Sequence, residues 1–158
     1  MSMAKNAQAI QELLIQRGIE SKVVEFSSST RTAADAAQAI GCDVAQILKS
    51  LIFRTKKTHR PILVLVSGAN RANEQLIEAA VGEEIVKADA DFTREVTGFA
   101  IGGIPPVGHK QKIETYIDED LLKLKEIWAT AGTPHSVFSI SSDLIVGLTE
   151  GKVIKVKS

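Results

Sequence analysis

Residues 49–68 read KSLIFRTKKTHRPILVLVSG, and this stretch decides the fold class. It contains two runs of apolar and β-branched residues, near Ser50–Thr55 and Pro61–Ser67. A polar segment, KKTHR, separates the runs, which is the pattern of two strands joined by a short connection. We therefore expect a β-sheet that includes this pair of strands.

Helices and further strands follow one another in mixed order on either side of the pair. Apolar spacing and capping residues predict helices over about Met3–Arg17, from Thr32 to Gly41, from Asn70 to about Val81 and from Asp89 to Val96, with short turns after Asp43, Asp118 and Ser142 or Asp143. Extended segments are expected at Lys22–Phe26, Glu84–Lys87, Phe99–Ile101, Lys112–Ile117, Glu126–Thr130, Ser136–Ile140 and Lys152–Val156. This order predicts an α+β protein, a mixed sheet with helices packed around it.

Length and composition restrict the class of protein. The 158 residues suit one domain, residues 1–158, and 44% hydrophobic with 24% charged residues is typical of an ordinary soluble chain. Lysine plus arginine and aspartate plus glutamate both number 19, and a net charge of zero argues against a protein that coats DNA. It leaves room for a local site that holds one nucleic-acid end. No apolar run approaches the length of a membrane helix, so no membrane partner is expected.

Cysteine and histidine usage argues against disulfide and metal chemistry. Cys42 is the single cysteine, which excludes a disulfide within the chain and fits a cytoplasmic location. The three histidines, at positions 59, 109 and 135, lie far apart in sequence and lack the spacing of metal ligands. We therefore expect no metal site.

A second stretch, AIGGIPPVGH over residues 100–109, is too rich in glycine and proline for a helix or an inner strand. One interpretation is a loop that only turns the chain. In the other, Gly102 and Gly103 let backbone amides approach a ligand closely, while Pro105 and Pro106 stiffen the loop. Such a loop can polarise a carbonyl or hold an oxyanion.

Lys49, in the segment QILKSLIF, stands between apolar residues at a predicted helix-to-strand junction. Lysines at such ends are often solvated, because their long stems reach water easily. A partly desolvated ammonium would instead be a strong point charge for a phosphate or a polarised carbonyl. No G-x-S-x-G elbow occurs and no nucleophile with its base is visible, so catalysis here would depend on positioning and polarisation.

The order of these segments resembles a known family. The chain runs through TAADAAQAIG, ILKSLIF, LVLVSGANR, TGFAIGGIPPVGH, a YIDEDL segment and WATAG, over about Ile10 to Val156. This order is similar to that of the YbaK family, also called the prolyl-tRNA synthetase editing-domain family. The most specific features are Lys49 in its apolar frame and the Gly102-x-x-x-Pro106 spacing.

The resemblance implies a single domain with a mixed, mostly antiparallel and barrel-like sheet. It implies an enzyme that hydrolyses the ester between a wrong amino acid and the 3′-terminal ribose of a tRNA, with no metal or organic cofactor. Family members occur within prolyl-tRNA synthetase or separately, and a chain without a synthetase portion resembles the separate kind. The expected partners are tRNA and, as a second candidate, an aminoacyl-tRNA synthetase.

Residue roles follow from the same resemblance. Lys49 matches the lysine that anchors the 3′ end of the substrate, and the loop from Gly102 through Gly103 to Pro106 matches one whose backbone cradles the aminoacyl group. The tRNA 2′-hydroxyl or a substrate thiol would assist the attack. Substrate contacts are predicted at Phe26, Ser50, Ile104, Pro105, Pro106, Gly108, His109, Thr130 and His135. Simple packing remains open for Phe26, and a plain loop position remains open for His135.

The substrate amino acid is left open by departures from the family pattern. The loop GGIPPVGH is nearer to the cysteine-specific branch, and Thr130 stands where that branch has a serine. Val137 stands where it has an aspartate, Arg31 or Thr32 where it has a second aromatic residue, and Ser50 where the alanine-specific branch has asparagine. Cysteinyl- or alanyl-tRNA(Pro), or a tRNA carrying another small amino acid, is therefore a candidate substrate. A non-catalytic module that binds tRNA or a synthetase is the alternative function.

Basic residues gather in the segment RTKKTHR and recur after the glycine-rich loop. Contacts with tRNA are predicted at Arg54, Lys56, Lys57, Arg60, Lys110 and Lys112. A solvated connection between two strands explains the RTKKTHR segment equally well.

Overall fold

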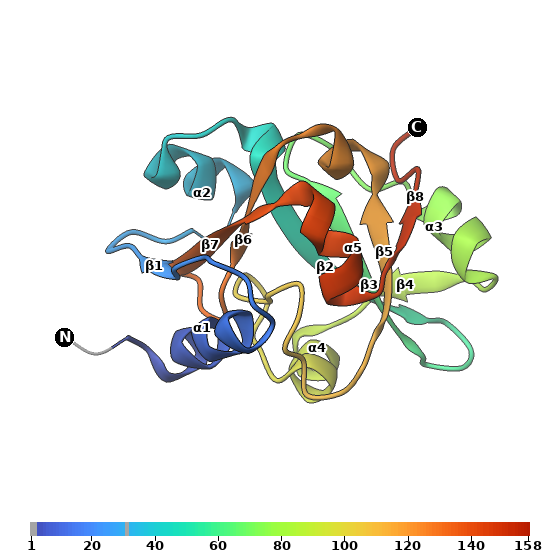
Figure 1. Ribbon diagram of the computed structural model, residues 1–158. Coiled ribbons are helices and arrows are strands. Elements are labelled where there is room, and N and C mark those ends of the chain that lie inside the picture. Colours follow the sequence, from blue (N-terminus) through green and yellow to red (C-terminus); the bar gives the residue numbers. More distant parts are fainter. Residues whose placement is uncertain (1–2, 31) are drawn as a thin grey trace.

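The two strands of the opening stretch lie at the centre of the sheet. The computed structural model describes residues 3–30 and 32–158. Strands β2 (Ile47–Thr55) and β3 (Pro61–Ser67) pair antiparallel, from Leu48 opposite Ser67 to Arg54 opposite Pro61 (Figure 1). The predicted pair of strands is therefore confirmed, and β2 begins earlier than the sequence indicated.

Six further strands extend this pair into one eight-stranded sheet. The hydrogen-bonded order is β1-β7-β6-β2-β3-β5-β8, and β4 pairs with the far end of β2. The pairs β2–β6, β3–β5 and β5–β8 are parallel and the others are antiparallel, so the sheet is mixed as predicted. The added strands are β1 (Val24–Glu25), β4 (Ile85–Lys87), β5 (Glu114–Asp118), β6 (Glu126–Thr130), β7 (Ser136–Ser141) and β8 (Lys152–Ile154).

The sheet is open, so the expected barrel-like closure is wrong. Strands β1 and β8 stand at the two ends of the order, and no pairing joins them within the described residues. They contain two and three residues. Edges this short provide too few ladder hydrogen bonds to close a barrel, which needs a continuous register around its circumference.

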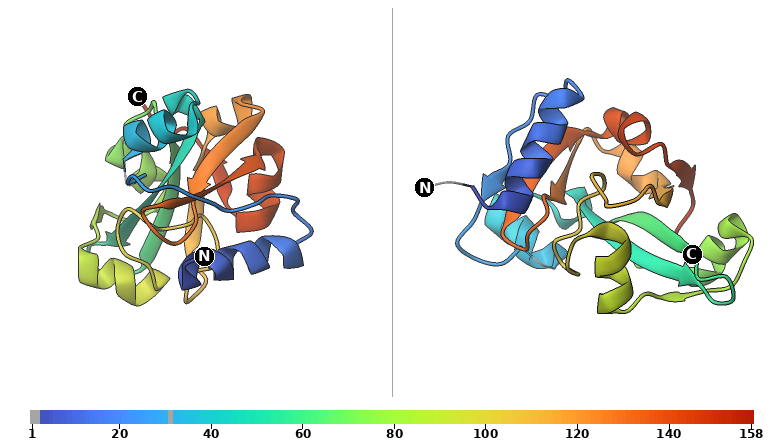
Figure 2. Two further views of the ribbon diagram at one scale, coloured as in Figure 1. Left: turned by 90° about the vertical axis from the view of Figure 1, so that its left-hand side faces the viewer. Right: turned by 90° about the horizontal axis from the view of Figure 1, so that it is seen from below.

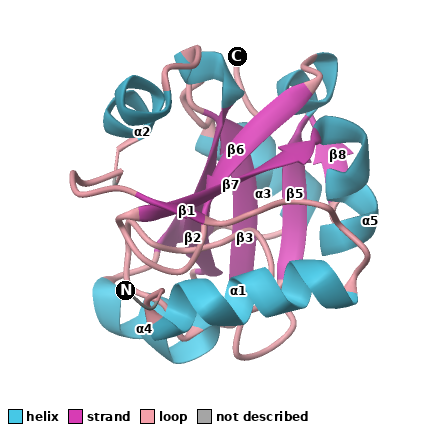
Figure 3. Ribbon diagram, turned by 60° about the vertical axis from the view of Figure 1, so that its left-hand side comes forward, coloured by secondary structure: helices cyan, strands magenta, loops and turns pink. Residues whose placement is uncertain are grey.

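Helices cover both faces of the sheet. The α-helices are α1 (Lys5–Gln16), α2 (Ala33–Ile40), α3 (Glu74–Val81), α4 (Ala90–Thr97) and α5 (Ile145–Thr149), and the 3₁₀ turns are η1 (Val44–Gln46), η2 (Glu119–Lys123) and η3 (Ser142–Leu144). Figure 3 shows α1 in front of the strands and α3 behind them. The two views of Figure 2 likewise separate α1, in dark blue, from α3, in light green.

Alternation along the central strands divides the core between these layers. Successive side chains of a strand point to opposite faces. One face of β2 and β3 contributes Leu48, Ile52, Leu63 and Leu65 to a cluster with α1, α4 and α5. The other face contributes Phe53, Ile62, Val64 and Val66 to a cluster with α3. Lys49 belongs to this second set by register, because it lies opposite Val66.

Helix boundaries follow the predicted caps at α2 and α4 but not at α3, and the turn η3 follows Ser141 and not Ser142 or Asp143. Thr32 and Asp89 cap α2 and α4, accepting hydrogen bonds from the amides of Asp35 and Phe92. Helix α3 is capped by Asn73 and not by Asn70, as the sequence had suggested. Asn70 is buried instead, where two carboxylates take up its side chain (see below).

The segment Phe99–Ile101 is a loop and not the expected strand. The amide of Phe99 is bound locally by the hydroxyl of Thr97 at 2.9 Å, which removes it from any ladder. Its aromatic ring packs in the core beside α1 and α4. None of the described helices is long and apolar enough to cross a membrane.

Candidate active site

A cavity lies where one edge of β2 has no paired strand. On this edge β2 pairs with β6 only at Ile47 and Leu48, and with β4 only from Phe53 onward. Residues 49–51 between these contacts and the glycine-rich loop border a cavity of about 290 Å³, here called the edge cavity. Its lining residues are Thr30, Thr32, Ala33, Ile47, Leu48, Lys49, Ser50, Leu51, Ile101, Gly102, Ile104 and Thr130.

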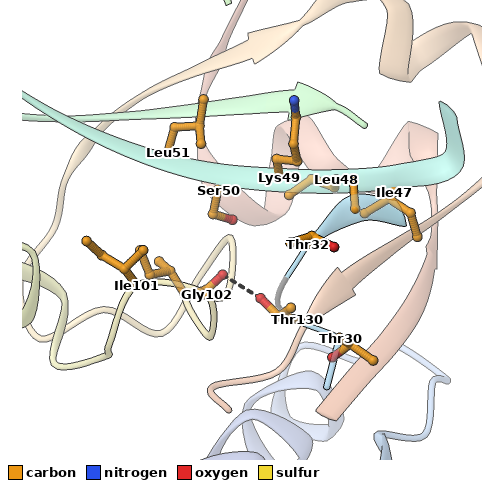
Figure 4. Close-up of a pocket in the computed structure, with 12 residues that line it drawn as sticks. Thr30, Thr32, Ile47, Leu48, Lys49, Ser50, Leu51, Ile101, Gly102 and Thr130 are labelled. Atoms are coloured by element: carbon orange, nitrogen blue, oxygen red, sulfur yellow. Dashed lines mark hydrogen bonds between the residues drawn. The ribbon is translucent and has the colours of Figure 1, made fainter. Parts of the chain in front are cut away.

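Lys49 borders the edge cavity with a half-buried side chain. Its ammonium donates a hydrogen bond to the backbone carbonyl of Asn70 at 2.7 Å. Figure 4 shows this side chain on one side of β2, whereas Ser50 points from the other side toward the loop of Gly102. Burial lowers the pKa of Lys49 below its ordinary value, and the negative charge of Asp118 opposes that shift. Lys49 and the loop therefore both border the edge cavity, but the Lys49 ammonium points away from the loop.

A buried carboxylate fixes the turn that receives Lys49. Asp118, at the end of β5, is 1% exposed and accepts hydrogen bonds from the amide of Ser67 at 3.0 Å and the side-chain amide of Asn70 at 2.8 Å. Asp120 accepts a second bond from the Asn70 side chain, also at 2.8 Å. Because two carboxylates hold the side chain of Asn70, its backbone carbonyl is kept in position to accept the hydrogen bond from Lys49.

The two adjacent glycines have different surroundings. Gly102 lines the cavity with φ of 94°, a left-handed conformation that side chains disfavour. Among the described residues no hydrogen bond takes up its amide. Gly103 lies behind the cavity wall, where its amide donates to the carbonyl of Ala100 at 3.0 Å and a Cβ would stand 3.0 Å from the backbone of Thr133. Gly102 is thus the glycine with a free donor, and Gly103 permits close packing.

Two side chains hold the loop in shape. The hydroxyl of Thr130 on β6 donates to the carbonyl of Ile104 at 2.8 Å, the bond dashed in Figure 4. The imidazole Nε2 of His109 lies 2.7 Å from the carbonyl of Pro105. Burial lowers the pKa of His109 below its ordinary value, while the bond to Pro105 opposes the shift. The neutral imidazole, which can donate this bond, is therefore the favoured form.

The edge cavity brings together five of the predicted catalytic and substrate-binding residues: Lys49, Ser50, Gly102, Ile104 and Thr130. Three others, Pro106, Gly108 and His109, line a different cavity of about 360 Å³ with Lys112. Pro105 is buried, and Phe26 donates its amide to the carbonyl of His135 at 2.8 Å. His135 is exposed and its ring contacts the carbonyl of Ser28.

Acidic partners pair with half of the six basic residues predicted to contact tRNA. Arg60 forms ion pairs with Glu83 at 2.8 Å and Glu114 at 3.0 Å. Lys56 pairs with Glu84 at 3.7 Å, and Lys112 pairs with Glu150 at 2.8 Å. Within the described chain Arg54, Lys57 and Lys110 have no ion pair. Arg54 lies on the same strand as Lys49 but five residues away, which is about 17 Å at about 3.3 Å per residue.

Sequence reasoning missed several residues of the cavity. The sequence analysis did not single out the hydrophobic lining residues Ile47, Leu51 and Ile101. It also did not single out Thr30, which lines the cavity shortly before α2 begins. Asn70 and Asp118 were interpreted only as capping residues. Their contact joins residues 48 positions apart in the sequence, so no local pattern indicates it. Arg31, considered as a replacement for an aromatic residue, lies outside the described residues.

Comparisons with known proteins agree with this architecture. The profile of the aminoacyl-tRNA editing domain matches residues 27–147. A crystal structure described as a candidate trans-editing enzyme for prolyl tRNA synthetase superposes with a TM-score of 0.92 and 44% identity, covering 99% of both chains. EbsC of Enterococcus faecalis, whose name proposes a Cys-tRNA(Pro)/Cys-tRNA(Cys) deacylase, is 24% identical over 89% of this chain and 87% of its own. A proline–tRNA ligase of Limosilactobacillus fermentum is 29% identical over 67% of this chain, which spans 19% of the ligase. The family profile covers most of the chain, and this chain therefore belongs to the aminoacyl-tRNA editing domain family.

Proposed function

We propose that this chain acts in trans to hydrolyse the ester between a wrong amino acid and the 3′-terminal ribose of a tRNA. The observation that carries the proposal is the edge cavity, which Lys49 and Gly102 border from distant parts of the sequence. The relative described as a trans-editing enzyme and the relative named as a deacylase support the same reaction. Prolyl-tRNA synthetase is the partner that the ligase relatives favour.

In this proposal the backbone amide of Gly102 donates a hydrogen bond to the carbonyl oxygen of the ester. This amide faces no competing acceptor within the described residues, and the adjacent cavity wall is mainly apolar. A backbone donor held in such surroundings stabilises negative charge on the carbonyl oxygen more strongly than water does, because it need not reorient during the reaction. Thr130 and His109 contribute indirectly, since they fix the loop that carries this donor.

Lys49 is assigned a different part of the substrate. Its ammonium lies across β2 from the loop, and we assign to it the terminal phosphate or ribose of the tRNA. When the tRNA end binds, the Lys49 ammonium exchanges its hydrogen bond to the Asn70 carbonyl for one to an anionic oxygen of the substrate. A partly desolvated ammonium attracts this charged oxygen more strongly than a neutral carbonyl. The position of the 3′ end is thereby set relative to Gly102.

The chemical step needs no protein nucleophile. Water adds to the ester carbon, the bond to the ribose 3′ oxygen breaks, and that oxygen leaves with the proton released by the water. The neighbouring 2′-hydroxyl of the tRNA can relay this proton. An activated ester needs less assistance than an amide, so orientation and polarisation supply the main part of the acceleration.

Hydrolysis of a panel of mischarged tRNAs, including alanyl- and cysteinyl-tRNA(Pro), tests the proposal. We expect Lys49→Met and Gly102→Ala each to lower kcat/KM at least tenfold, about 1.4 kcal/mol of transition-state stabilisation. Lys152→Met, which removes an exposed lysine on β8, is the matched control and retains the wild-type rate. Binding of tRNA without hydrolysis of any ester would refute the catalytic proposal and favour the non-catalytic module.

A further inference from the structure

A second cavity adjoins the edge cavity and contains two unpaired hydroxyls. This side cavity has a volume of about 220 Å³ and shares Ser50, Leu51, Ile101 and Ile104 with the edge cavity. Its other lining residues are Ile52, Phe53, Lys87, Ala88 and Thr93. The two cavities are therefore adjacent at these four residues.

Thr93 is 1% exposed on the inner side of α4, yet its hydroxyl has no hydrogen-bond partner among the described residues. Its backbone is fully engaged: the amide donates to Asp89 and the carbonyl accepts from Thr97. A buried hydroxyl in this state is uncommon, because burial without a partner costs free energy that valine, of nearly the same shape, avoids. The hydroxyl is therefore positioned for a group that enters the side cavity.

Ser50 presents a second unpaired hydroxyl from a different element. Its Oγ is buried and without a partner within the described residues, and it points from β2 toward the loop of Gly102 (Figure 4). Apart from Ser50 and Thr93, the walls are hydrophobic, with exposed Lys87 as the one charged lining residue. Two neutral hydroxyls in apolar walls suit a small neutral group that can both donate and accept a hydrogen bond.

We propose that Ser50 and Thr93 recognise a hydroxyl on the amino-acid side chain of the substrate, so that seryl and threonyl esters are preferred over alanyl and valyl esters. The proposal rests on the function proposed above, which places the ester at Gly102 and leaves the amino-acid side chain to enter the side cavity. A site that hydrogen-bonds a substrate hydroxyl rejects the analogue that lacks it, because its own polar groups are then left unpaired.

The test compares one tRNA acylated with threonine or with its isostere valine. We expect wild-type protein to hydrolyse the threonyl ester at least tenfold faster, and the seryl ester faster than the alanyl and cysteinyl esters. Ser50→Ala and Thr93→Val should each reduce the threonine-to-valine ratio toward one, whereas Thr93→Ser, which keeps the hydroxyl, should preserve the preference. Thermal unfolding of Thr93→Val should occur at an unchanged or higher Tm, because no hydrogen bond is lost.

A binding measurement separates this proposal from the catalytic one. Non-hydrolysable 3′-amide analogues of threonyl- and valyl-adenosine are titrated against wild-type protein and the three variants. Tighter binding of the threonyl analogue that Thr93→Val abolishes would support the subsite even if no ester is hydrolysed. Equal binding of the two analogues, binding of neither, or an unchanged preference in both Ser50→Ala and Thr93→Val would overturn it.

Discussion

Replacing Asp118 with asparagine tests whether a buried carboxylate holds the turn that receives Lys49. Asp118 is 1% exposed. One of its oxygens accepts from Ser67 at 3.0 Å and Asn70 at 2.8 Å, and the other accepts from the amide of Asp120 at 2.9 Å. Asparagine keeps the shape but replaces one acceptor with an NH₂ donor, which must then face at least one N–H group.

The expected loss follows from these contacts. A hydrogen bond to a charged group contributes about 1.5–3 kcal/mol, and a buried donor left unpaired adds to the cost. We expect Asp118→Asn to lower the free energy of unfolding by about 2–4 kcal/mol. For a domain of this length, the corresponding fall in Tm is about 4–16 °C.

Urea denaturation and thermal unfolding measure this loss. Glu119→Gln removes the same charge from the exposed neighbouring residue and should change the free energy of unfolding by no more than about 0.5 kcal/mol. Asp118→Asn should also lower the pKa of Lys49 further, because the charge of Asp118 opposes the effect of burial. Equal stability of the two variants, with no change in the Lys49 titration, would refute the role given to Asp118.

Two further predictions concern the glycine-rich loop. Gly103→Ala should destabilise the fold by about 1–3 kcal/mol in denaturation, because its Cβ meets backbone at 3.0 Å, whereas Gly147→Ala on α5, with nothing within 4 Å, should be neutral or stabilising. The reverse order of stabilities would contradict the packing argument. Burial lowers the pKa of His109 below its ordinary value of 6.5, so the stability it contributes is present above pH 6.5 and is lost as the pH falls below that value through the folded-state pKa. His109→Gln should remove the loss of stability that protonation of His109 causes at low pH, whereas His135→Gln, at an exposed position, should not. Identical dependence of unfolding on pH in the two variants would exclude this role of His109.

Short-range signals predicted the boundaries of most elements. Thr32 and Gly41 delimit α2, and Asp89 and Gly98 delimit α4, because a cap and a left-handed glycine act on backbone groups only a few residues away. The same kind of signal misplaced the start of α3. Asn70 is a plausible cap by its residue type, but carboxylates that arrive from β5 and η2 take its side chain.

The candidate site was predicted only in part, because motifs are local and do not show which residues meet in the fold. Lys49 and the glycine-rich loop were recognised as motifs, and the edge cavity contains both. Motif matching treated Gly102 and Gly103 alike and grouped His109 with the substrate contacts. The structure assigns Gly103 to packing against Thr133, and His109 to the support of Pro105.

By itself the sequence determined the central strand pair, the helix caps, the family resemblance and the presence of a lysine and a glycine loop, since these depend on residue type and local spacing. Only the tertiary structure decided that one edge of β2 has no paired strand at residues 49–52, that the Lys49 ammonium turns to Asn70, and that acidic residues neutralise Arg60. Each of these depends on contacts between residues distant in the chain. Burial, charge pairing and open hydrogen-bond donors arise from such contacts, and no local pattern encodes them.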